Sequence, residues 1–505
     1  MCNTIIPMGG GRSVCMPDES LFVNRDDELK QLNALITKLD HGGYLPKSVF
    51  NIYGAPGIGK SSLLAELKRQ WSSGRYRLLF INLHDRGLPR ETTQQKKFCC
   101  EQLVAQLATD AGNTPQIAQI DEQLQQAPED ERFDAIGAAL VRLLEPYKAN
   151  QIIILMVDAC EQATDACFAW LERRILLPLI HEPEEQQTRL LCLLTSQLIL
   201  RWRQHNVRRR VDLIALEPLS PEATHLQVNA LLNGRAAGTH EQPSPESLSL
   251  GQHIYNLTFG HPLATKKAIE RLVAEAGQPA EYGAWLSQNE NQQSLSSRVV
   301  VEIQDHAIKS MAGKKLSSEN WDILEALAIL REFEVNVMRV VLPTYHEKYG
   351  EISQSMLLIY IRELLETRLA IWNSEVRAYQ IAPAIRRIIA RRLALHKPEL
   401  YQNLRAKAQA YYAKQIETVM NNRHVYLLEY LFQRLSAAPP RTLAREQLSR
   451  EFEKFLTKHY HLRDESLKQL NDALEQDKEL QELLVQHDLA EDLFTSCVQT
   501  FYVAA

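Results

Sequence analysis

The residues with the clearest chemical potential form a glycine-rich run, Gly54–Ser61, with the sequence GAPGIGKS. Its three glycines let backbone N–H groups turn inward around phosphate oxygens. The helix-forming segment that follows, Ser62–Gln70, adds the favourable dipole of a helix N-terminus. In such a loop the Lys60 ammonium reaches the β- and γ-phosphates, and the Ser61 hydroxyl ligates Mg²⁺. The run therefore predicts a nucleoside triphosphate site, with a tight turn between strand and helix as the alternative interpretation.

Two acids after an apolar run predict the other half of this site. Asp158 directly follows Ile152–Val157, and a carboxylate at the C-terminal end of a buried parallel strand points into the ligand crevice. It is therefore the candidate for the second Mg²⁺ contact. The next acid, Glu161, could position the water that attacks the γ-phosphate. It could equally be a first-turn acid that complements a helix dipole, and the sequence leaves both roles open.

Alternating strand and helix patterns would position these residues. The strand candidates are rich in apolar and β-branched residues and lie at Val49–Tyr53, Arg77–Leu83, Ile152–Val157, Leu190–Thr195 and Val211–Leu216. Buried strands that alternate with helices predict a parallel sheet covered by helices on both faces. After Leu216 the pattern is helical, with a Pro- and Ser-rich break at Gln242–Ser249.

Length and composition limit the classes of protein. The chain has 505 residues, of which 45% are hydrophobic and 24% charged, enough for several globular domains. A net charge of −5 argues against a surface that coats nucleic acid or an anionic membrane. The apolar runs are too short to span a bilayer and no secretion signal is visible, so we expect a cytoplasmic protein without a membrane partner. The eight cysteines lack metal spacing and are expected to be reduced core thiols.

The order of the motifs resembles the STAND class of signal-transducing P-loop ATPases, a branch of the AAA+-like fold. The opening Leu21–Leu29 is similar to the F-V-G-R-x-x-E-L motif of that class, and the phosphate loop follows it. In many related ATPases a Glu stands directly after the strand-end Asp, where this chain has Ala159. The run from Asp158 to Glu161, with Trp170-Leu171 and Leu176–Leu179 after it, resembles the D-x-x-E…W-L…L-L-P-L run of a prokaryotic subgroup, in which Glu161 has a counterpart.

Later segments carry further resemblances and three departures. Gly260–Ala264 resembles the G-x-P motif, whose proline, here Pro262, packs near the adenine in relatives. Gln197 stands where relatives usually have an Arg that contacts phosphate. Ala382 stands where many have a His that contacts the β-phosphate of ADP. The third departure is the C-terminal region, 398–505, which is helical but shows no sustained repeat, so we expect either a helical cap or a docking surface for a partner.

Residues 317–395 read as three helices, a hairpin and a fourth helix, an order that resembles the winged-helix domain of STAND proteins. Its last helix is basic, and the cations could form a nucleic-acid stripe or, as we favour, a solvated face paired with acids. These residues are Arg386, Arg387, Arg391, Arg392 and Lys397. The run Arg208–Arg210 has the same two interpretations and a third, an arginine finger for a neighbouring subunit.

Together these patterns predict an α/β P-loop NTPase domain with a parallel, AAA+-like sheet at 21–216, after a flexible arm at 1–20. A helical lid at 217–305, a winged-helix domain at 306–397 and an all-α C-terminal region at 398–505 would follow. Lys60, Asp158 and Glu161 are the candidate catalytic residues, and Ser61 and Asp158 the candidate Mg²⁺ ligands. The residues expected to bind ATP or ADP are Arg25, Gly54, Ala55, Pro56, Gly57, Ile58, Gly59, Lys60, Ser61, Ser62 and Pro262.

The resemblance implies an ATP-hydrolysing molecular switch that couples nucleotide state to conformation and assembly in signalling, regulation or defence. It implies a nucleotide-dependent homo-oligomer and a separate effector or sensor protein as partners. The alternative is a DNA-acting AAA+ ATPase of the initiator or transposition-regulator type that uses its winged helix. A metabolic P-loop kinase is disfavoured because no acceptor-substrate domain is visible in the sequence.

Overall fold

The computed structural model describes most of the chain in two compact units, one of residues 1–285 with 301–314 and the other of residues 286–300 with 315–505. The described residues are 25–72, 74–84, 88–108, 114–125, 130–148, 151–180, 189–233, 245–309, 317–366, 369–373, 377–419, 423–439, 441–460 and 465–504. The expected flexible arm at 1–20 and the first four residues of the opening motif lie outside them. The domain boundaries that the sequence suggests stay predictions.

The first unit contains a five-stranded parallel sheet with the strand order β2-β3-β4-β1-β5. Its strands are β1 Val49–Tyr53, β2 Tyr76–Asn82, β3 Ile152–Asp158, β4 Leu190–Ser196 and β5 Val211–Ala215. Each begins and ends within one residue of the predicted run. In this order the C-terminal ends of β1, β3 and β4 are neighbours, with Tyr53 paired with Ser196, so the phosphate loop and Asp158 meet at one edge.

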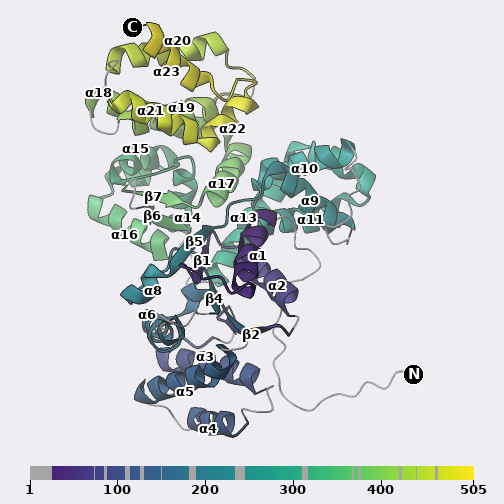
Figure 1. Cartoon of the computed structure of the whole chain (residues 1–505). Helices are drawn as coiled ribbons and strands as arrows, with labels where there is room; N and C mark the ends of the chain where they lie inside the picture. Colours follow the sequence, from purple (N-terminus) through teal and green to yellow (C-terminus); the bar gives the residue numbers. More distant parts are fainter. Residues whose placement is uncertain are drawn as a thin grey trace. The chain divides into compact units, whose positions relative to one another are not determined.

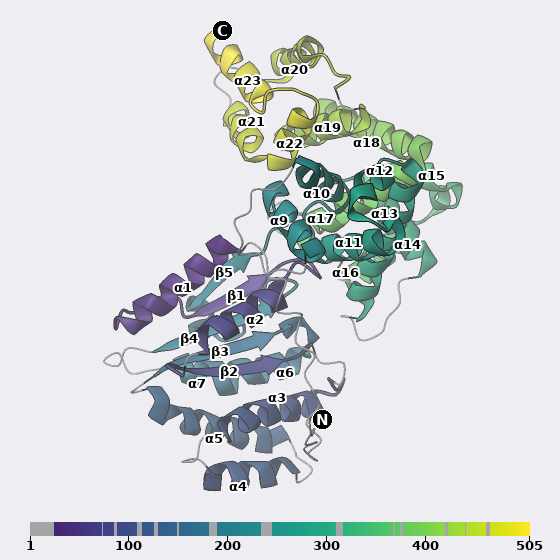
Figure 2. The ribbon, with the colours of Figure 1, turned by 90° about the vertical axis from the view of Figure 1, so that its right-hand side faces the viewer.

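Helices cover both faces of this sheet, as the alternation of apolar runs predicts (Figure 2). Along β3 successive side chains point to opposite faces, and the whole strand is buried. Ile153, Leu155 and Val157 pack in one cluster with α3 Thr92–Leu107 and α5 Asp130–Lys148. The alternate residues Ile152, Ile154 and Met156 pack in another cluster with α1 Asp26–Asp40 and α2 Lys60–Trp71.

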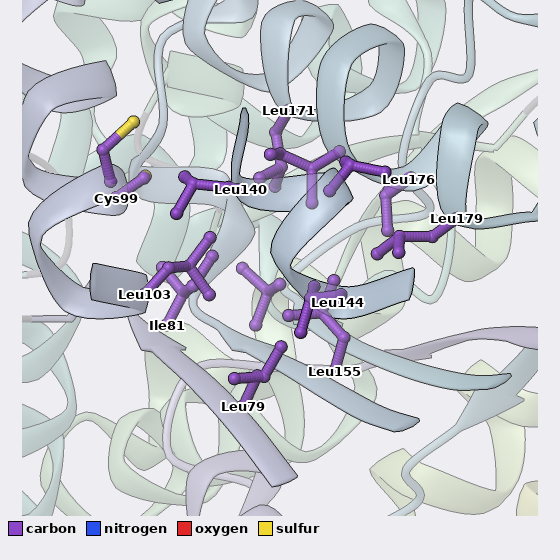
Figure 3. Packing of buried hydrophobic residues seen from close by; sticks show 14 of the residues in the cluster. Leu79, Ile81, Cys99, Leu103, Leu140, Leu144, Leu155, Leu171, Leu176 and Leu179 are labelled. Carbon is purple, nitrogen blue, oxygen red and sulfur yellow. The ribbon is translucent and has the colours of Figure 1, made fainter. Parts of the chain in front are cut away.

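Figure 3 shows part of the first cluster, in which Leu79 and Ile81 of β2 and Leu155 of β3 lie against Leu103 of α3 and Leu140 of α5. The other elements after β2 and before the lid are α4 Thr114–Gln125, the 3-10 turn η2 Cys160–Gln162, α6 Asp165–Leu171, the π-helical turn η3 Glu172–Leu176, α7 Leu177–Ile180 and α8 His205–Arg209. The cysteines of the described residues, Cys99, Cys100, Cys160, Cys167, Cys192 and Cys497, are buried free thiols, and burial raises the pKa of Cys192.

The segment expected to be a lid is helical and begins with α9 Pro221–Asn233, α10 Pro245–Thr258 and α11 Pro262–Ala276, followed by η4 Pro279–Glu281 and α12 Tyr282–Leu286. The Pro- and Ser-rich break was placed partly wrongly, because α10 already starts at Pro245; residues 242–244 lie outside the described part of the chain. Proline is tolerated at a helix start, where its missing N–H has no intrahelical partner. Gly260, with φ +71°, turns the chain from α10 into α11, and its carbonyl accepts from the Leu219 N–H at 2.8 Å.

The second unit contains the expected order of helix, helix, helix, hairpin and helix. These elements are α14 Ser318–Leu327, α15 Val335–Tyr345, α16 Gln354–Glu366, the antiparallel strands β6 Ala370–Asn373 and β7 Ala378–Ile381, and α17 Pro383–His396, with the 3-10 turn η5 Glu347–Glu351 after α15. Helix α13 Asn289–Lys309 runs from residues of this unit into residues of the first.

Four of the five basic residues in and directly after α17 are bound to acids of neighbouring elements within this unit, and Arg391 pairs with no acid among the described residues. Arg386 is only 2% exposed and pairs with Glu479. Arg387 pairs with Glu482 at 2.7 Å, and Lys397 pairs with Glu325 at 3.0 Å. Arg392 bonds to Glu325 as well. The favoured pairing with acids is therefore correct for these four residues and wrong for Arg391. The expected solvated face is wrong at Arg386, because its guanidinium is buried against Phe432 and Glu479 of the C-terminal helices.

Six helices form the C-terminal region, which is yellow-green to yellow in Figure 1. They are α18 Pro398–Thr418, α19 Arg423–Ala437, α20 Arg445–His459, α21 Glu465–Gln476, α22 Lys478–Gln486 and α23 Leu493–Ala504. They enclose a cluster of buried leucines and phenylalanines, including Leu435, Phe452 and Phe494. Arg405 of α18 also donates to the Ile329 carbonyl after α14 at 2.8 Å, which supports the cap interpretation. Within the described residues, none of the helices has the length and apolarity that crossing a bilayer requires.

Candidate functional site

The glycine-rich run forms a loop between β1 and α2 with the backbone that a phosphate cradle needs. Gly57 and Gly59 have φ +77° and +101°, values that side-chain-bearing residues rarely adopt. Helix α2 begins at Lys60, with Gly59 as its N-cap. The Lys60 ammonium folds back over the loop and donates to the carbonyls of Gly54 at 2.7 Å and Ala55 at 2.9 Å. The loop therefore gathers backbone N–H groups, a helix N-terminus and a cation in one place.

The Lys60 side chain is 8% exposed. Burial lowers the pKa of Lys60, and the nearby carboxylates of Glu161 and Asp158 raise it in part. Removing a charged ammonium from water costs free energy unless anions surround it. An ATP phosphate chain would supply such anions, so the residues present fit a nucleotide.

Asp158 is held at the end of β3 by two hydroxyl groups from neighbouring elements. Its Oδ1 accepts hydrogen bonds from Ser61 Oγ, at 3.1 Å, and from Thr195 Oγ1. Thr195 Oγ1 in turn accepts from the Ala159 N–H at 2.8 Å. Ser61 and Asp158, the two predicted Mg²⁺ ligands, are thus neighbours with oxygen atoms at hydrogen-bonding distance. Oxygen ligands of this kind suit Mg²⁺.

Glu161 lies in the 3-10 turn η2, not in the first turn of a longer helix. The helix that follows, α6, begins at Asp165 and is capped by Thr164, whose hydroxyl accepts from the Cys167 N–H at 3.2 Å. A three-residue turn has little dipole for an acid to complement. Glu161 also lines the same cavity as Lys60, an arrangement that favours the catalytic interpretation.

The start of α11 is bonded directly to the phosphate loop. His261 is fully buried, and its Nε2 donates to the Pro56 carbonyl at 2.8 Å while its Nδ1 accepts from the Ala264 N–H at 3.2 Å. The Leu263 N–H donates to the Gly57 carbonyl at 3.3 Å. A Cβ on Gly57 would lie 2.9 Å from both His261 and Leu263. The loop and the lid therefore move as one body wherever these contacts persist.

His261 gives this contact a pH dependence. The pKa of His261 is lowered from 6.5 to about 4, chiefly by burial and also by nearby His306 and Lys60, although the hydrogen bond to Pro56 raises it in part. A protonated ring would also lose the acceptor that holds the Ala264 N–H. Between these two pH values the unfolded chain binds a proton that the folded chain excludes, so stability is present above pH 6.5 and falls toward pH 4, by on the order of 3 kcal/mol.

We expect His261→Gln, whose amide N–H can still donate to Pro56, to lose this part of the pH dependence. Urea unfolding of both proteins at several values between pH 7.5 and 4.5 would measure it. The difference between the two stability curves isolates His261 from the other groups that titrate in that range. Curves that stay parallel over the whole range would contradict the assignment.

A cavity of about 400 Å³ lies between the phosphate loop, the strand ends and the lid helices of the first unit. This size is within the usual range of small-molecule sites. Among the predicted residues, the cavity is lined by Pro56, Gly57, Gly59, Lys60, Ser61, Ser62, Asp158, Glu161 and Pro262. The structure therefore brings the predicted catalytic residues, the predicted metal ligands and Pro262 together.

Four predicted nucleotide residues do not line this cavity, namely Arg25, Gly54, Ala55 and Ile58. Arg25, directly before α1, donates to the Ile58 carbonyl at 3.0 Å and pairs with Glu28 at 3.2 Å. It is 7% exposed, and burial lowers its pKa. Arg25 therefore stabilises the phosphate loop through the Ile58 carbonyl. The carbonyls of Gly54 and Ala55 bind the Lys60 ammonium.

Several residues that line the cavity were not singled out by the sequence. They are Asn82, His84, Ala159, Thr195, Gln197, Gln227, Leu231, Leu263, Lys266 and His306, of which Gln197 was considered only as a missing arginine. Asn82 ends strand β2 and His84 follows two residues later, so the rule that placed Asp158 could have found them. His306 stands near the end of α13, where no local pattern points to a ligand.

The arginine run before β5 lies at the opposite end of the sheet from the phosphate loop. The Arg210 carbonyl accepts from the Val49 N–H at the start of β1, and its guanidinium donates to the Leu45 carbonyl at 3.2 Å. Arg208 and Arg209 are exposed. These arginines therefore do not reach the cavity of their own chain, and a role in a neighbouring subunit stays a hypothesis.

A parallel sheet with a glycine-rich phosphate loop, a strand-end aspartate and a helical lid defines a P-loop NTPase. Residues 21–198 match the family model described as AAA ATPase domain, so this part of the chain is similar to that family. Proteins of this class bind ATP and hydrolyse it. No curated protein matches the chain.

Some solved structures are similar to the chain at low identity. Cdc6p from Pyrobaculum aerophilum is 17% identical, with 77% of this chain and 97% of that chain covered and a TM-score of 0.38. The ORC2 protein of Aeropyrum pernix is 16% identical, with 78% and 96% covered and a TM-score of 0.43. The STAND protein PH0952 from Pyrococcus horikoshii, which has a tetratricopeptide repeat sensor, is 15% identical, with 97% and 68% covered and a TM-score of 0.32. At these identities the similarity indicates no function.

Proposed function

We propose that the chain is an ATP-driven molecular switch of the STAND type, in which the nucleotide determines how the lid packs on the P-loop domain. The observation that carries the proposal is the direct bonding of α11 to the phosphate loop, through His261 to Pro56 and Leu263 to Gly57. A ligand shifts a conformational equilibrium only through contacts that differ between two states. Phosphates in the loop would change contacts that also hold the lid.

Each residue of the site would have its own role in ATP hydrolysis. Lys60 would neutralise charge on the β- and γ-phosphates, while Ser61 and Asp158 would hold Mg²⁺. Glu161 would orient the attacking water and accept its proton. ATP and ADP would then define the two states, and hydrolysis would reset the switch.

Helix α13 contributes residues to both units, and one of its residues reaches the site. Its residue His306 lines the cavity, whereas Gln293, in the half of the helix that belongs to the second unit, donates to the Leu395 carbonyl at 2.8 Å. Ser297, in the same half, bonds to His396 at 2.8 Å. We infer that the nucleotide would shift His306 and, with it, the part of α13 that belongs to the first unit.

We expect the ATP-dependent change of conformation to lead to assembly of the chain. We propose a homo-oligomer that forms in the ATP state, with Arg208 or Arg209 as candidates to reach a neighbouring subunit's nucleotide, since both are exposed at the end of α8. A separate sensor or effector protein is the second proposed partner.

A DNA-acting AAA+ ATPase is the alternative function, and it would use the basic helix α17. Arg386 is buried, and Arg387 and Lys397 bind acids of the same unit, which leaves less positive charge for DNA phosphates. Helix α16, one helix earlier, exposes the apolar side chains Met356, Leu358 and Ile359. These observations support a signalling switch over a DNA-binding ATPase.

Size-exclusion chromatography with light scattering tests the proposal. The protein is run with ADP, with a non-hydrolysable ATP analogue, and with each plus duplex DNA. We expect the analogue alone to raise the molar mass. Lys60→Ala should abolish the effect, because the variant loses the cation that contacts the phosphates, whereas Lys30→Ala, which removes an exposed lysine of α1, should leave it unchanged.

The other outcomes separate the candidate functions. Assembly that requires DNA would favour the initiator-like ATPase, and salt-sensitive DNA binding would support that result. Phosphate transfer from ATP to a small molecule rather than to water would support the metabolic P-loop kinase instead. A molar mass that changes with none of the nucleotides would contradict both the signalling switch and the initiator-like ATPase.

A further inference from the structure

Gln95, near the start of α3, is a buried glutamine whose amide forms three hydrogen bonds. The residue is 3% exposed. Its Nε2 donates to the Pro89 carbonyl at 2.9 Å and to the Gln162 carbonyl at 3.2 Å, and its Oε1 accepts from the Thr164 N–H at 2.7 Å. Backbone carbonyls only accept and a backbone N–H only donates, so these partners permit a single orientation of the amide. Two of the three bonds join α3 to residues that lie 67 and 69 positions further along the chain.

The segment that Gln95 binds is the one that carries Glu161. Gln162 is the last residue of the turn η2, and Thr164 is the N-cap of α6. On the other side of the acid, the Ala159 N–H donates to Thr195 Oγ1 at 2.8 Å. The backbone that carries Glu161 is therefore held on both sides, by a side chain of β4 before it and by a side chain of α3 after it.

The turn η2 has few hydrogen bonds of its own. The Gln162 N–H donates to the Ala159 carbonyl at 2.8 Å, and the Ala163 N–H donates to the Cys160 carbonyl at 3.2 Å. Such 3-10 turns are short and have poor hydrogen-bond geometry. A general base acts only within hydrogen-bonding reach of the proton that it accepts, and a displacement of about 1 Å can lower a rate about a hundredfold. The position of the carboxylate therefore depends on the contacts that hold the turn from outside.

Thr92 joins the same two elements without binding the turn. Its Oγ1 lies 2.9 Å from Thr164 Oγ1, and Thr164 belongs to the start of α6 rather than to η2. Loss of this contact would weaken the attachment of α6 to α3 but would leave the Gln162 carbonyl bound to Gln95. The two side chains therefore allow attachment of the helix to be separated from attachment of the turn.

We propose that Gln95 is a positioning residue for ATP hydrolysis, which fixes the backbone of η2 so that the Glu161 carboxylate can accept a proton from the attacking water. The inference rests on the proposed function, in which Glu161 is the general base, and adds the group that sets the position of that base. Gln95 is not among the described residues that line the cavity, so it acts through Glu161. Removing its amide would leave the Gln162 carbonyl and the Thr164 N–H without this partner, and the turn would shift to find others.

Single-turnover ATP hydrolysis by the full chain with Mg²⁺, with nucleotide affinity measured in parallel, tests the proposal. Gln95→Met keeps the approximate length and volume of the side chain but loses its hydrogen bonds. Gln94→Met is the matched control, because it makes the same change at the exposed neighbouring position of α3. Thr92→Val removes the hydroxyl that meets Thr164. Gln95→Met is also combined with Glu161→Gln in a double-mutant cycle.

We expect Gln95→Met to hydrolyse ATP about ten- to a hundredfold more slowly than the wild type. Its affinity for ATP should be unchanged, because Lys60 and Asp158 keep their places. Gln94→Met and Thr92→Val should hydrolyse ATP at the wild-type rate. In the Glu161→Gln background, Gln95→Met should have no further effect, because a residue that acts only through the general base has no base left to position.

Other results would overturn the proposal. A further slowing of Glu161→Gln by Gln95→Met, or an equal slowing in Thr92→Val, would give Gln95 a merely structural role, as would a loss of affinity that accounts for the slower rate. If Gln95→Met does not fold, Gln95→Asn decides: its amide is one methylene too short for the same partners, so it must lower the rate at unchanged affinity or the proposal fails. A wild type that does not hydrolyse ATP, or a Glu161→Gln variant that hydrolyses it normally, would instead refute the proposed function of the site.

Discussion

Replacing Glu161 with Gln is expected to lower the rate of ATP hydrolysis by roughly 10²- to 10⁴-fold, the usual contribution of a general base. The amide keeps the size and hydrogen bonding of the side chain but cannot accept the proton of the attacking water. ATP affinity should change little, because Lys60 and Asp158 remain in place. Single-turnover hydrolysis with excess enzyme measures the chemical step without product release, and nucleotide binding is measured in parallel.

Glu101→Gln is the matched control, because it makes the same change on α3 at a side chain that is 44% exposed. Its hydrolysis rate should equal that of the wild type. If Glu161→Gln hydrolysed ATP at the normal rate, the acid would have only the helix-start role. A large loss of ATP binding would instead assign Glu161 to the charge balance of Lys60, whose pKa it raises.

Residues 159 and 161 both line the cavity, and the backbone explains why the acid is at position 161. Ala159 has φ 59°, a left-handed conformation that is costly for a residue with a side chain. Its N–H is held by Thr195 Oγ1, and Thr195 also binds Asp158. A glutamate at position 159 would be attached to a residue whose backbone is strained and whose N–H is already hydrogen-bonded. The turn η2 moves the carboxylate two residues onward, where the backbone is ordinary.

Local patterns were sufficient for the sheet and for the phosphate loop. The strands were predictable because buried parallel strands are continuous apolar runs, and β3, Ile152–Asp158, is buried along its whole length. The loop was predictable because its phosphate-binding groups are consecutive in sequence. Asp158 followed from the rule that ligands bind at the C-terminal ends of parallel strands.

The lid contacts could not be predicted in this way, because they join residues far apart in the sequence. His261 reaches Pro56 across 205 positions, and a Gly-His-Pro run alone indicates only a loop. Gln227 has no distinguishing neighbours on α9, and only the structure shows that it is buried and donates to the Pro262 carbonyl. The sequence shows that α17 is basic, but the acids that pair with its residues lie on other helices. A nucleic-acid-binding stripe and an ion-pair network therefore have the same sequence pattern.

Gly260→Ala is expected to lower the stability of the folded lid by about 2–5 kcal/mol, the sum of left-handed strain and a steric overlap. Gly260 has φ +71°, and an added Cβ would lie 1.9 Å from the Leu219 carbonyl oxygen. That atom is backbone and cannot rotate away. The hydrogen bond from the Leu219 N–H to the Gly260 carbonyl, 2.8 Å long, would have to lengthen.

Because Gly260 precedes His261, the displacement should also loosen the bond between α11 and Pro56. Urea unfolding with and without ATP measures both effects: the variant should unfold at lower urea and gain less stability from ATP than the wild type does. Gly283→Ala is the control, since an added Cβ there meets no atom within 4 Å and the residue lies inside α12. A variant that loses stability but keeps the full ATP-induced gain would show that the lid and the phosphate loop are not coupled through His261.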